Sequence, residues 1–200
     1  MCRDMPPLEQ AIQFHGHICP GILMGVRAAE LALKHLQLER DRDEELLAVV
    51  ETDSCGVDAI QSILGCTFGK GNLIFKDYGK AVYTIARRDK GKAIRIAQKF
   101  NPKRSPGFDR YRELDGRKDL TEEEKVEREN LLGQIFESIM TAPWEDIFDW
   151  REVDFDFPEK AQIRRTLQCS RCGEGVMEGR AISIEDEVLC PSCYLDKGGQ

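Results

Sequence analysis

The chain has 200 residues, of which 41% are hydrophobic and 32% charged, a composition ordinary for a soluble globular protein. Its net charge of −7 excludes a global positive field of the kind that gathers nucleic acid or anionic lipid, so we expect neither as a partner. No apolar run reaches the roughly 18 residues of a membrane-spanning helix, and the first residues lack the apolar core of a signal peptide. We therefore expect a cytoplasmic protein, in which clustered cysteines indicate metal binding or catalysis more than disulfides.

The first third of the chain predicts helices with one strand between them. The longest helix has apolar residues at the four-three spacing of a single buried face. A continuous apolar run of strand length follows, and Gly65 marks the end of the last helix in this part. The predicted elements are helices over residues 8–14, 21–36 and 57–64, and a strand over residues 46–50.

The middle of the chain predicts three short strands, a loop and a second long helix. The strands cover residues 73–76, 81–86 and 93–96. Because turn residues separate them, we expect an antiparallel meander. Residues 101–116 are rich in Pro, Gly, Arg and Asp and predict a surface loop. The helix over 122–140 begins with a capping box formed by Thr121 and Glu124.

The composition changes near residue 166, where the sequence becomes rich in Cys, Gly and Glu. Residues 143–165 alternate large aromatics with acids and are expected to close the core or to bridge to the C-terminal segment. We therefore expect a core domain over 1–165 and a small domain over 166–200. Because helices and strands do not alternate regularly, the core is predicted to be α+β, a mixed or antiparallel sheet with packed helices.

The C-terminal segment contains two CxxC pairs separated by 17 residues, and their cysteines are Cys169, Cys172, Cys190 and Cys193. This spacing predicts a zinc ribbon, in which four thiolates fill the coordination sphere and give the metal a structural role. A segment of about 35 residues has too little core to fold without a metal or a cross-link. Acids outnumber bases here, so we expect the ribbon to contact protein or support a dimer rather than bind nucleic acid.

A second group of metal-ligating residue types lies near the N-terminus. His15, His17 and Cys19 alternate just before the predicted helix over 21–36. If the segment is extended, the three side chains face one side, and Cys19 lies at a helix N-terminus, where the helix dipole lowers a thiol pKa. Cys55 occupies the same place before the next helix. We interpret the group as a second metal site or a reactive thiol pair.

The glycine-rich segment over residues 65–72 does not match a phosphate-binding loop. Its glycines are too close together, and Gly71 stands where such a loop needs Ser or Thr. A turn that lends Lys70 and backbone amides to the site is the more modest expectation. Cys66 follows the end of a predicted helix, where the dipole disfavours a thiolate, so we interpret it as structural.

Three motifs in this order resemble the FmdE family, whose name comes from molybdenum or tungsten formylmethanofuran dehydrogenase. The motifs cover residues 14–21 with Gly25, residues 55–61 and residues 65–72. The resemblance is close over residues 8–100. It implies an α+β core that forms a homodimer and a groove lined by His and Cys, and some members of the family have a C-terminal zinc ribbon.

Carried over by position, the resemblance implies a divalent metal in the groove with His17, Cys19 and Cys55 as its ligands. The neighbouring residues, which we expect to bind a cofactor or ligand, are His15, Asp58, Gln61 and Lys70. No residue is assigned a catalytic role, and the sequence does not decide whether the protein is an enzyme.

Two functions of different classes are compatible with these residues. The first is an accessory or subunit-like metalloprotein of molybdenum- or tungsten-linked one-carbon metabolism, which binds a metal or a pterin-type ligand and joins a larger metalloenzyme complex. The second is a zinc-dependent interaction or regulatory protein without catalytic activity, in which the groove cysteines sense redox state and the ribbon binds a partner. A thiol oxidoreductase is a weaker third interpretation, because the core contains no CxxC motif.

Overall fold

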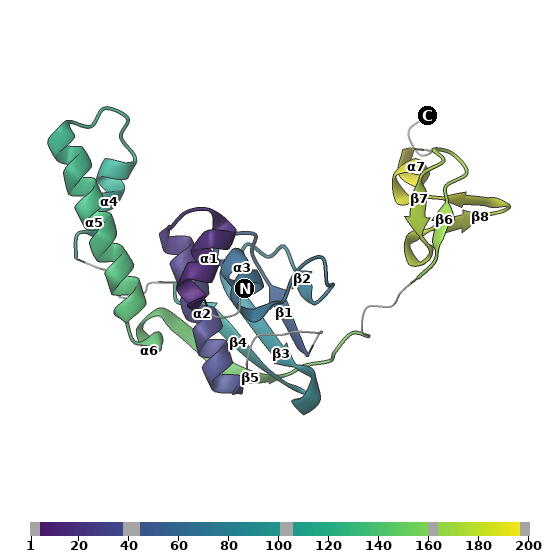
Figure 1. Cartoon of the computed structure of the whole chain (residues 1–200), viewed down its shortest axis with the longest axis horizontal. Helices are drawn as coiled ribbons and strands as arrows, with labels where there is room; N and C mark the ends of the chain where they lie inside the picture. Colours follow the sequence, from purple (N-terminus) through teal and green to yellow (C-terminus); the bar gives the residue numbers. More distant parts are fainter. Residues whose placement is uncertain (1–4, 38–44, 101–105, 160–163, 197–200) are drawn as a thin grey trace. The chain divides into compact units, whose positions relative to one another are not determined.

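The protein divides into two compact units, residues 1–159 and residues 160–200. The computed structural model describes residues 5–37, 45–100, 106–159 and 164–196 (Figure 1). Within those ranges, every helix is too short or too polar to cross a membrane.

A five-stranded mixed sheet forms the centre of the first unit, in the order β2-β1-β3-β4-β5. The strands are β1 (Leu46–Val50), β2 (Leu73–Phe75), β3 (Val82–Arg87), β4 (Lys92–Gln98) and β5 (Phe148–Asp154). Neighbouring strands from β1 through β3 and β4 to β5 pair antiparallel, with Val49 opposite Thr84 and Ile96 opposite Trp150. The predicted α+β class with a mixed sheet is confirmed.

The predicted meander is wrong for its first strand. β2 pairs parallel with β1 at the sheet edge, with Val49 opposite Ile74, and does not touch β3. The chain leaves β1, forms α3 (Gly56–Leu64) and returns beside β1 in the same direction. Because parallel strands need such a crossover, the carboxyl ends of β1 and β2 come to lie at one edge, next to the start of α3.

Three helices supply the other half of the hydrophobic core. They are α1 (Pro7–His15), α2 (Pro20–Leu36) and α3, and they lie together at the sheet in Figure 1. Alternate strand residues such as Ala48, Val50 and Ile85 pack against fully buried helix residues such as Leu23 and Ile60. The period-two pattern of the strands therefore gives one face of the sheet to these helices.

Two glycines allow α2 and α3 to pack with their backbones in contact. A Cβ atom added to Gly25 would lie 2.4 Å from the Gly56 carbonyl oxygen, and one added to Gly56 would lie 2.2 Å from the Tyr83 hydroxyl. No side chain larger than a hydrogen fits at either position without a shift of the backbone or of Tyr83. This contact places the starts of α2 and α3, with Cys19 and Cys55, side by side.

A helical hairpin follows the sheet, formed by α4 (Phe108–Asp115) and α5 (Glu122–Thr141). The loop expected over 101–116 is wrong for α4, and residues 101–105 lie outside the described part. The predicted capping box of α5 is confirmed: the Glu124 amide donates to Thr121 Oγ1 over 3.2 Å, and the Thr121 amide donates to Glu124 Oε2 over 2.9 Å.

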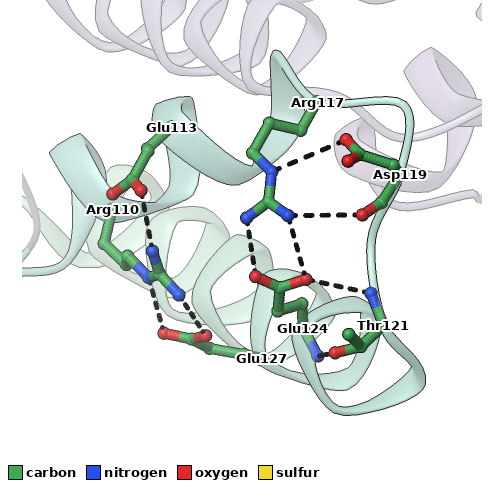
Figure 2. Close-up of polar contacts among 7 residues, drawn as sticks. All are labelled: Arg110, Glu113, Arg117, Asp119, Thr121, Glu124 and Glu127. Atoms are coloured by element: carbon green, nitrogen blue, oxygen red, sulfur yellow. Dashed lines mark hydrogen bonds and ion pairs between the residues drawn. The ribbon is translucent and has the colours of Figure 1, made fainter.

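Ion pairs hold the distal end of this hairpin together, as Figure 2 shows. Arg110 binds both carboxylate oxygens of Glu127 at 2.9 Å, and Arg117 donates to Glu124 over 2.6 Å. Apolar contacts contribute at Leu114, which is fully buried, and at Ile135, nearer the core. The short helix α6 (Trp144–Ile147) then leads into β5.

The second unit consists of two hairpins and one short helix. Its elements are β6 (Thr166–Gln168), β7 (Gly175–Met177), β8 (Ile182–Ile184), β9 (Glu187–Leu189) and α7 (Pro191–Leu195). The predicted hairpin around Glu185 and Asp186 is present, although the expected long strand before it is divided into β7 and β8. Its buried apolar side chains include Val176 and Leu189, a very small core.

Candidate metal centre

The His and Cys group of the first unit lies where α1 ends and α2 and α3 begin. His15 is the last residue of α1, because Gly16 adopts the left-handed conformation with φ of 91° that ends the helix. Cys19 caps α2, and its sulfur accepts a hydrogen bond from the Ile22 amide over 3.4 Å. The expected extended segment is therefore wrong at His15, but the turn at Gly16 still directs the chain back toward the site.

A carboxylate fixes the His15 ring. His15 Nδ1 lies 2.7 Å from Asp58 Oδ2, and the other carboxylate oxygen of Asp58 accepts a hydrogen bond from Gln61 Nε2 over 3.3 Å. His15 Nε2 is consequently directed away from Asp58 and lies 3.8 Å from Cys19 Sγ. A histidine whose second nitrogen binds a carboxylate is the usual arrangement of a metal-ligating imidazole.

Donor atoms of His15, His17 and Cys19 all lie within 4.8 Å of one another. The two imidazole rings are 4.5 Å apart between centroids, and His17 is the exposed one. In a tetrahedral zinc site a nitrogen and a sulfur ligand are about 3.6 Å apart, given bonds of about 2.05 and 2.3 Å. The separation of His15 Nε2 from Cys19 Sγ is close to that value, so these donors fit a divalent metal.

Cys55 lies beside Cys19, on the other side of Gly21. A Cβ added to Gly21 would be 3.8 Å from Cys19 Sγ and 3.6 Å from Cys55 Sγ. Desolvation by burial, with the hydrogen bond and negative charge of Cys19 as further causes, raises the pKa of Cys55. The lowering expected from the helix dipole is therefore wrong for Cys55, because burial and a second sulfur outweigh it.

A pocket of about 320 Å³ opens next to this group, at the carboxyl ends of β1 and β2. Its walls are both apolar and polar, with Val50, Leu73 and Phe75 from the strands and His15, Cys55 and Asp58 from the site. Among the described lining residues Lys70 does not occur. Lys70 belongs to the turn after α3, which is tied to the site through the Phe68 amide and Gln61 Oε1, 3.4 Å apart.

The structure thus brings together most of the residues that the sequence singled out, and adds others. His15 joins His17 and Cys19 in the three-donor group, whereas Cys55 lies just beyond it. Sequence reasoning missed Phe75 and Tyr83. Tyr83 is buried under the start of α3 and hydrogen-bonds Ser54, and burial raises its pKa. Its position on a buried strand gave no signal of this contact.

The second unit contains a four-cysteine cluster, with Cys169, Cys172, Cys190 and Cys193 all within 4.8 Å of one another. Cys172 Sγ and Cys190 Sγ are 3.9 Å apart, close to the sulfur–sulfur edge of about 3.8 Å in a tetrahedral zinc site. Backbone amides, that of Cys172 above all, lower the pKa of Cys169 to about 6. The hydrogen bond with Cys190 raises the pKa of Cys193 to about 12. Four thiols so close cannot all ionise unless a cation shares their charge.

Comparisons with known proteins agree with the geometry. The model of a family described as FmdE, Molybdenum formylmethanofuran dehydrogenase operon, matches residues 14–149. The crystal structure of a tungsten formylmethanofuran dehydrogenase FmdE-like protein from Syntrophus aciditrophicus is similar, with a TM-score of 0.64 and 26% identity. That similarity covers 96% of this chain and 91% of the other.

A curated relative from Archaeoglobus fulgidus is 31% identical over 196 residues and is described as a probable S-adenosyl-L-methionine-binding protein. The match covers 93% of this chain but 52% of the relative. The chain therefore spans about half the length of that protein.

Proposed function

Because the chain belongs to the FmdE family, we propose that it is a metal-binding accessory protein of molybdenum- or tungsten-linked one-carbon metabolism, with a divalent metal in the groove of its first unit. The contact between His15 and Asp58 is the observation that supports this most directly. A carboxylate holds the ring, its free nitrogen faces a thiol 3.8 Å away, and a second imidazole stands beside it.

The proposed ligands are His15, His17 and Cys19, with Cys55 close enough to replace one of them when the side chains adjust. Sequence reasoning placed His15 among the neighbours, and its carboxylate partner is the reason to include it. Three protein ligands leave a coordination position for a ligand in the adjoining pocket. A metal bound there would act as a Lewis acid toward an oxygen, nitrogen or sulfur atom of that ligand.

The four-cysteine cluster is proposed to hold zinc with a structural role. Its four thiols complete a tetrahedral coordination sphere, so no position is left for a substrate. We further propose that the protein acts as a homodimer in the cytoplasm and associates with a larger dehydrogenase complex. Family membership supports these last points.

The experiment that tests the groove is a metal count per chain. Wild-type protein purified without chelators is expected to bind two metal ions, and the Cys19→Ser/Cys55→Ser double variant is expected to bind one. Cys66→Ala is the matched control, because Cys66 is buried in the core, outside both clusters. A single ion in both wild type and double variant would refute the groove site and leave the ribbon intact.

S-adenosyl-L-methionine binding is a second candidate function, favoured by the curated relative. The pocket at the carboxyl ends of β1 and β2 is where ligands commonly bind in sheets that contain parallel strands. Titration calorimetry with S-adenosyl-L-methionine tests it, with Phe75→Ala as the variant expected to weaken binding. Absence of heat with wild-type protein, with and without added zinc, would exclude this candidate.

A further inference from the structure

The sulfur atoms of Cys19 and Cys55 meet above Gly21, although they belong to the starts of two different helices. The position of a methyl group on Gly21 is 3.8 Å from one sulfur and 3.6 Å from the other. Glycine places no side chain there, and the two cysteines interact directly through a hydrogen bond. The pair is therefore adjacent in space with nothing between its sulfurs.

The backbone, rather than flexible side chains, creates this proximity. Cys19 Sγ is held over the first turn of α2 by the Ile22 amide. The contact between Gly25 and Gly56 fixes how closely α2 and α3 approach. A disulfide requires its two Cβ atoms to be about 3.5–4.5 Å apart, so close packing of the two helix starts is the condition for one to form.

We propose that Cys19 and Cys55 are a modification site, which forms a reversible disulfide when no metal ion holds the two sulfurs. With a low-molecular-weight disulfide as oxidant, one cysteine thiolate attacks a reagent sulfur and expels a thiolate. The second cysteine then attacks the mixed disulfide and expels the other half of the reagent. The protein loses two electrons and two protons, and the reagent is reduced to two thiols.

Oxidation and metal binding then exclude each other, because both use the same sulfur lone pairs. That exclusion rests on the proposed function, whereas formation of the disulfide does not. Cys66 does not share the reactivity, since it is fully buried behind the end of α3. The disulfide would join the start of α2 to the start of α3 and remove Cys19 from the three-donor group.

The test uses the full chain, dialysed against a chelator and treated with oxidised glutathione before tryptic peptide mapping. Trypsin cleaves after Arg27 and Lys34, so Cys19 and Cys55 fall on different peptides. A linked peptide that has lost two hydrogen atoms identifies the bond. Cys55 and Cys66 share one tryptic peptide, and fragmentation of the linked species separates them.

The expected product is the Cys19–Cys55 link in preference to glutathione adducts, and dithiothreitol is expected to reverse it. Gly21→Ala should slow its formation several-fold, because the new methyl group lies against both sulfurs, whereas Gly133→Ala adds a methyl in open space and should not. Glutathione adducts on both cysteines without a link would overturn the proposal. A link that forms as fast with zinc present would support the disulfide and refute the metal site through these sulfurs.

Discussion

The two cysteine-containing sites of this protein use the same donor atom in different ways. In the second unit four thiols surround one point, so a metal bound there would be closed off from any ligand. In the first unit one thiol shares its position with two imidazoles, a carboxylate orients one ring, and a pocket of about 320 Å³ opens alongside. The number of cysteines therefore says little about function, whereas the mixture of donors and the access to them say much.

The comparison predicts its largest effect in the second unit. Cys169→Ser/Cys190→Ser should unfold residues 164–196, because its few buried side chains cannot replace the roughly 10–16 kcal/mol that structural zinc supplies. Amide proton NMR spectra should show the second unit collapse to random-coil shifts while the first unit keeps its dispersion. Cys19→Ser is the control and should leave the second unit folded. Dispersed signals for both units in the double variant would contradict a structural metal.

A smaller loss is expected when the helix contact under the groove is disturbed. Gly25→Val would drive a side chain into the Gly56 backbone, 2.4 Å from the added Cβ. Overpacking of this kind costs about 1–3 kcal/mol, and it should separate Cys19 from Cys55. Urea unfolding measures the first effect and metal titration the second. If Gly133→Ala, which meets nothing within 4 Å, lost as much, the close contact would not be the cause.

Orientation of the ligand, rather than the fold, is the target of the next change. Asp58→Asn should weaken metal binding in the groove about 10–100-fold, since the partner of His15 Nδ1 is altered. That corresponds to about 1.4–2.7 kcal/mol of binding free energy, with ribbon metal unchanged. Competition with a chromogenic chelator gives both affinities. Asp53→Asn is the matched control, because Asp53 lines the pocket without reaching His15; equal losses in both variants would point to net charge instead.

The elements that the sequence predicted well are those with a local signal. The apolar face of α2, the run of β1 and the capping box of α5 each depend on residues a few positions apart. The parallel pairing of β2 was missed because strand partners are chosen across the whole fold. α4 was missed because it is polar and has a single fully buried side chain, Leu114.

The same distinction holds within the groove. His15, His17 and Cys19 could be grouped from sequence because they are neighbours, and Cys55 because it shares the helix-start position and the family motif. The partnership of His15 with Asp58 and the contact of Gly25 with Gly56 join distant segments. Only the folded chain can show which imidazole a carboxylate holds, so which residues are ligands could not be decided beforehand.

The smallest effect is expected in the hairpin, far from either cysteine site in sequence. Thr121→Ala removes the acceptor for the Glu124 amide and should cost about 1 kcal/mol at the start of α5. Hydrogen exchange should accelerate in the first turn of α5, while exchange in α2 and both metal affinities stay unchanged. Thr141→Ala is the control, because its hydroxyl binds a carbonyl at the other end of the same helix. Since exposed ion pairs such as Arg110 with Glu127 are screened by salt, raising the ionic strength should enlarge the effect. A loss of groove metal in Thr121→Ala would mean that the hairpin is coupled to the site, and the separation of the two cysteine sites from the rest of the first unit would have to be abandoned.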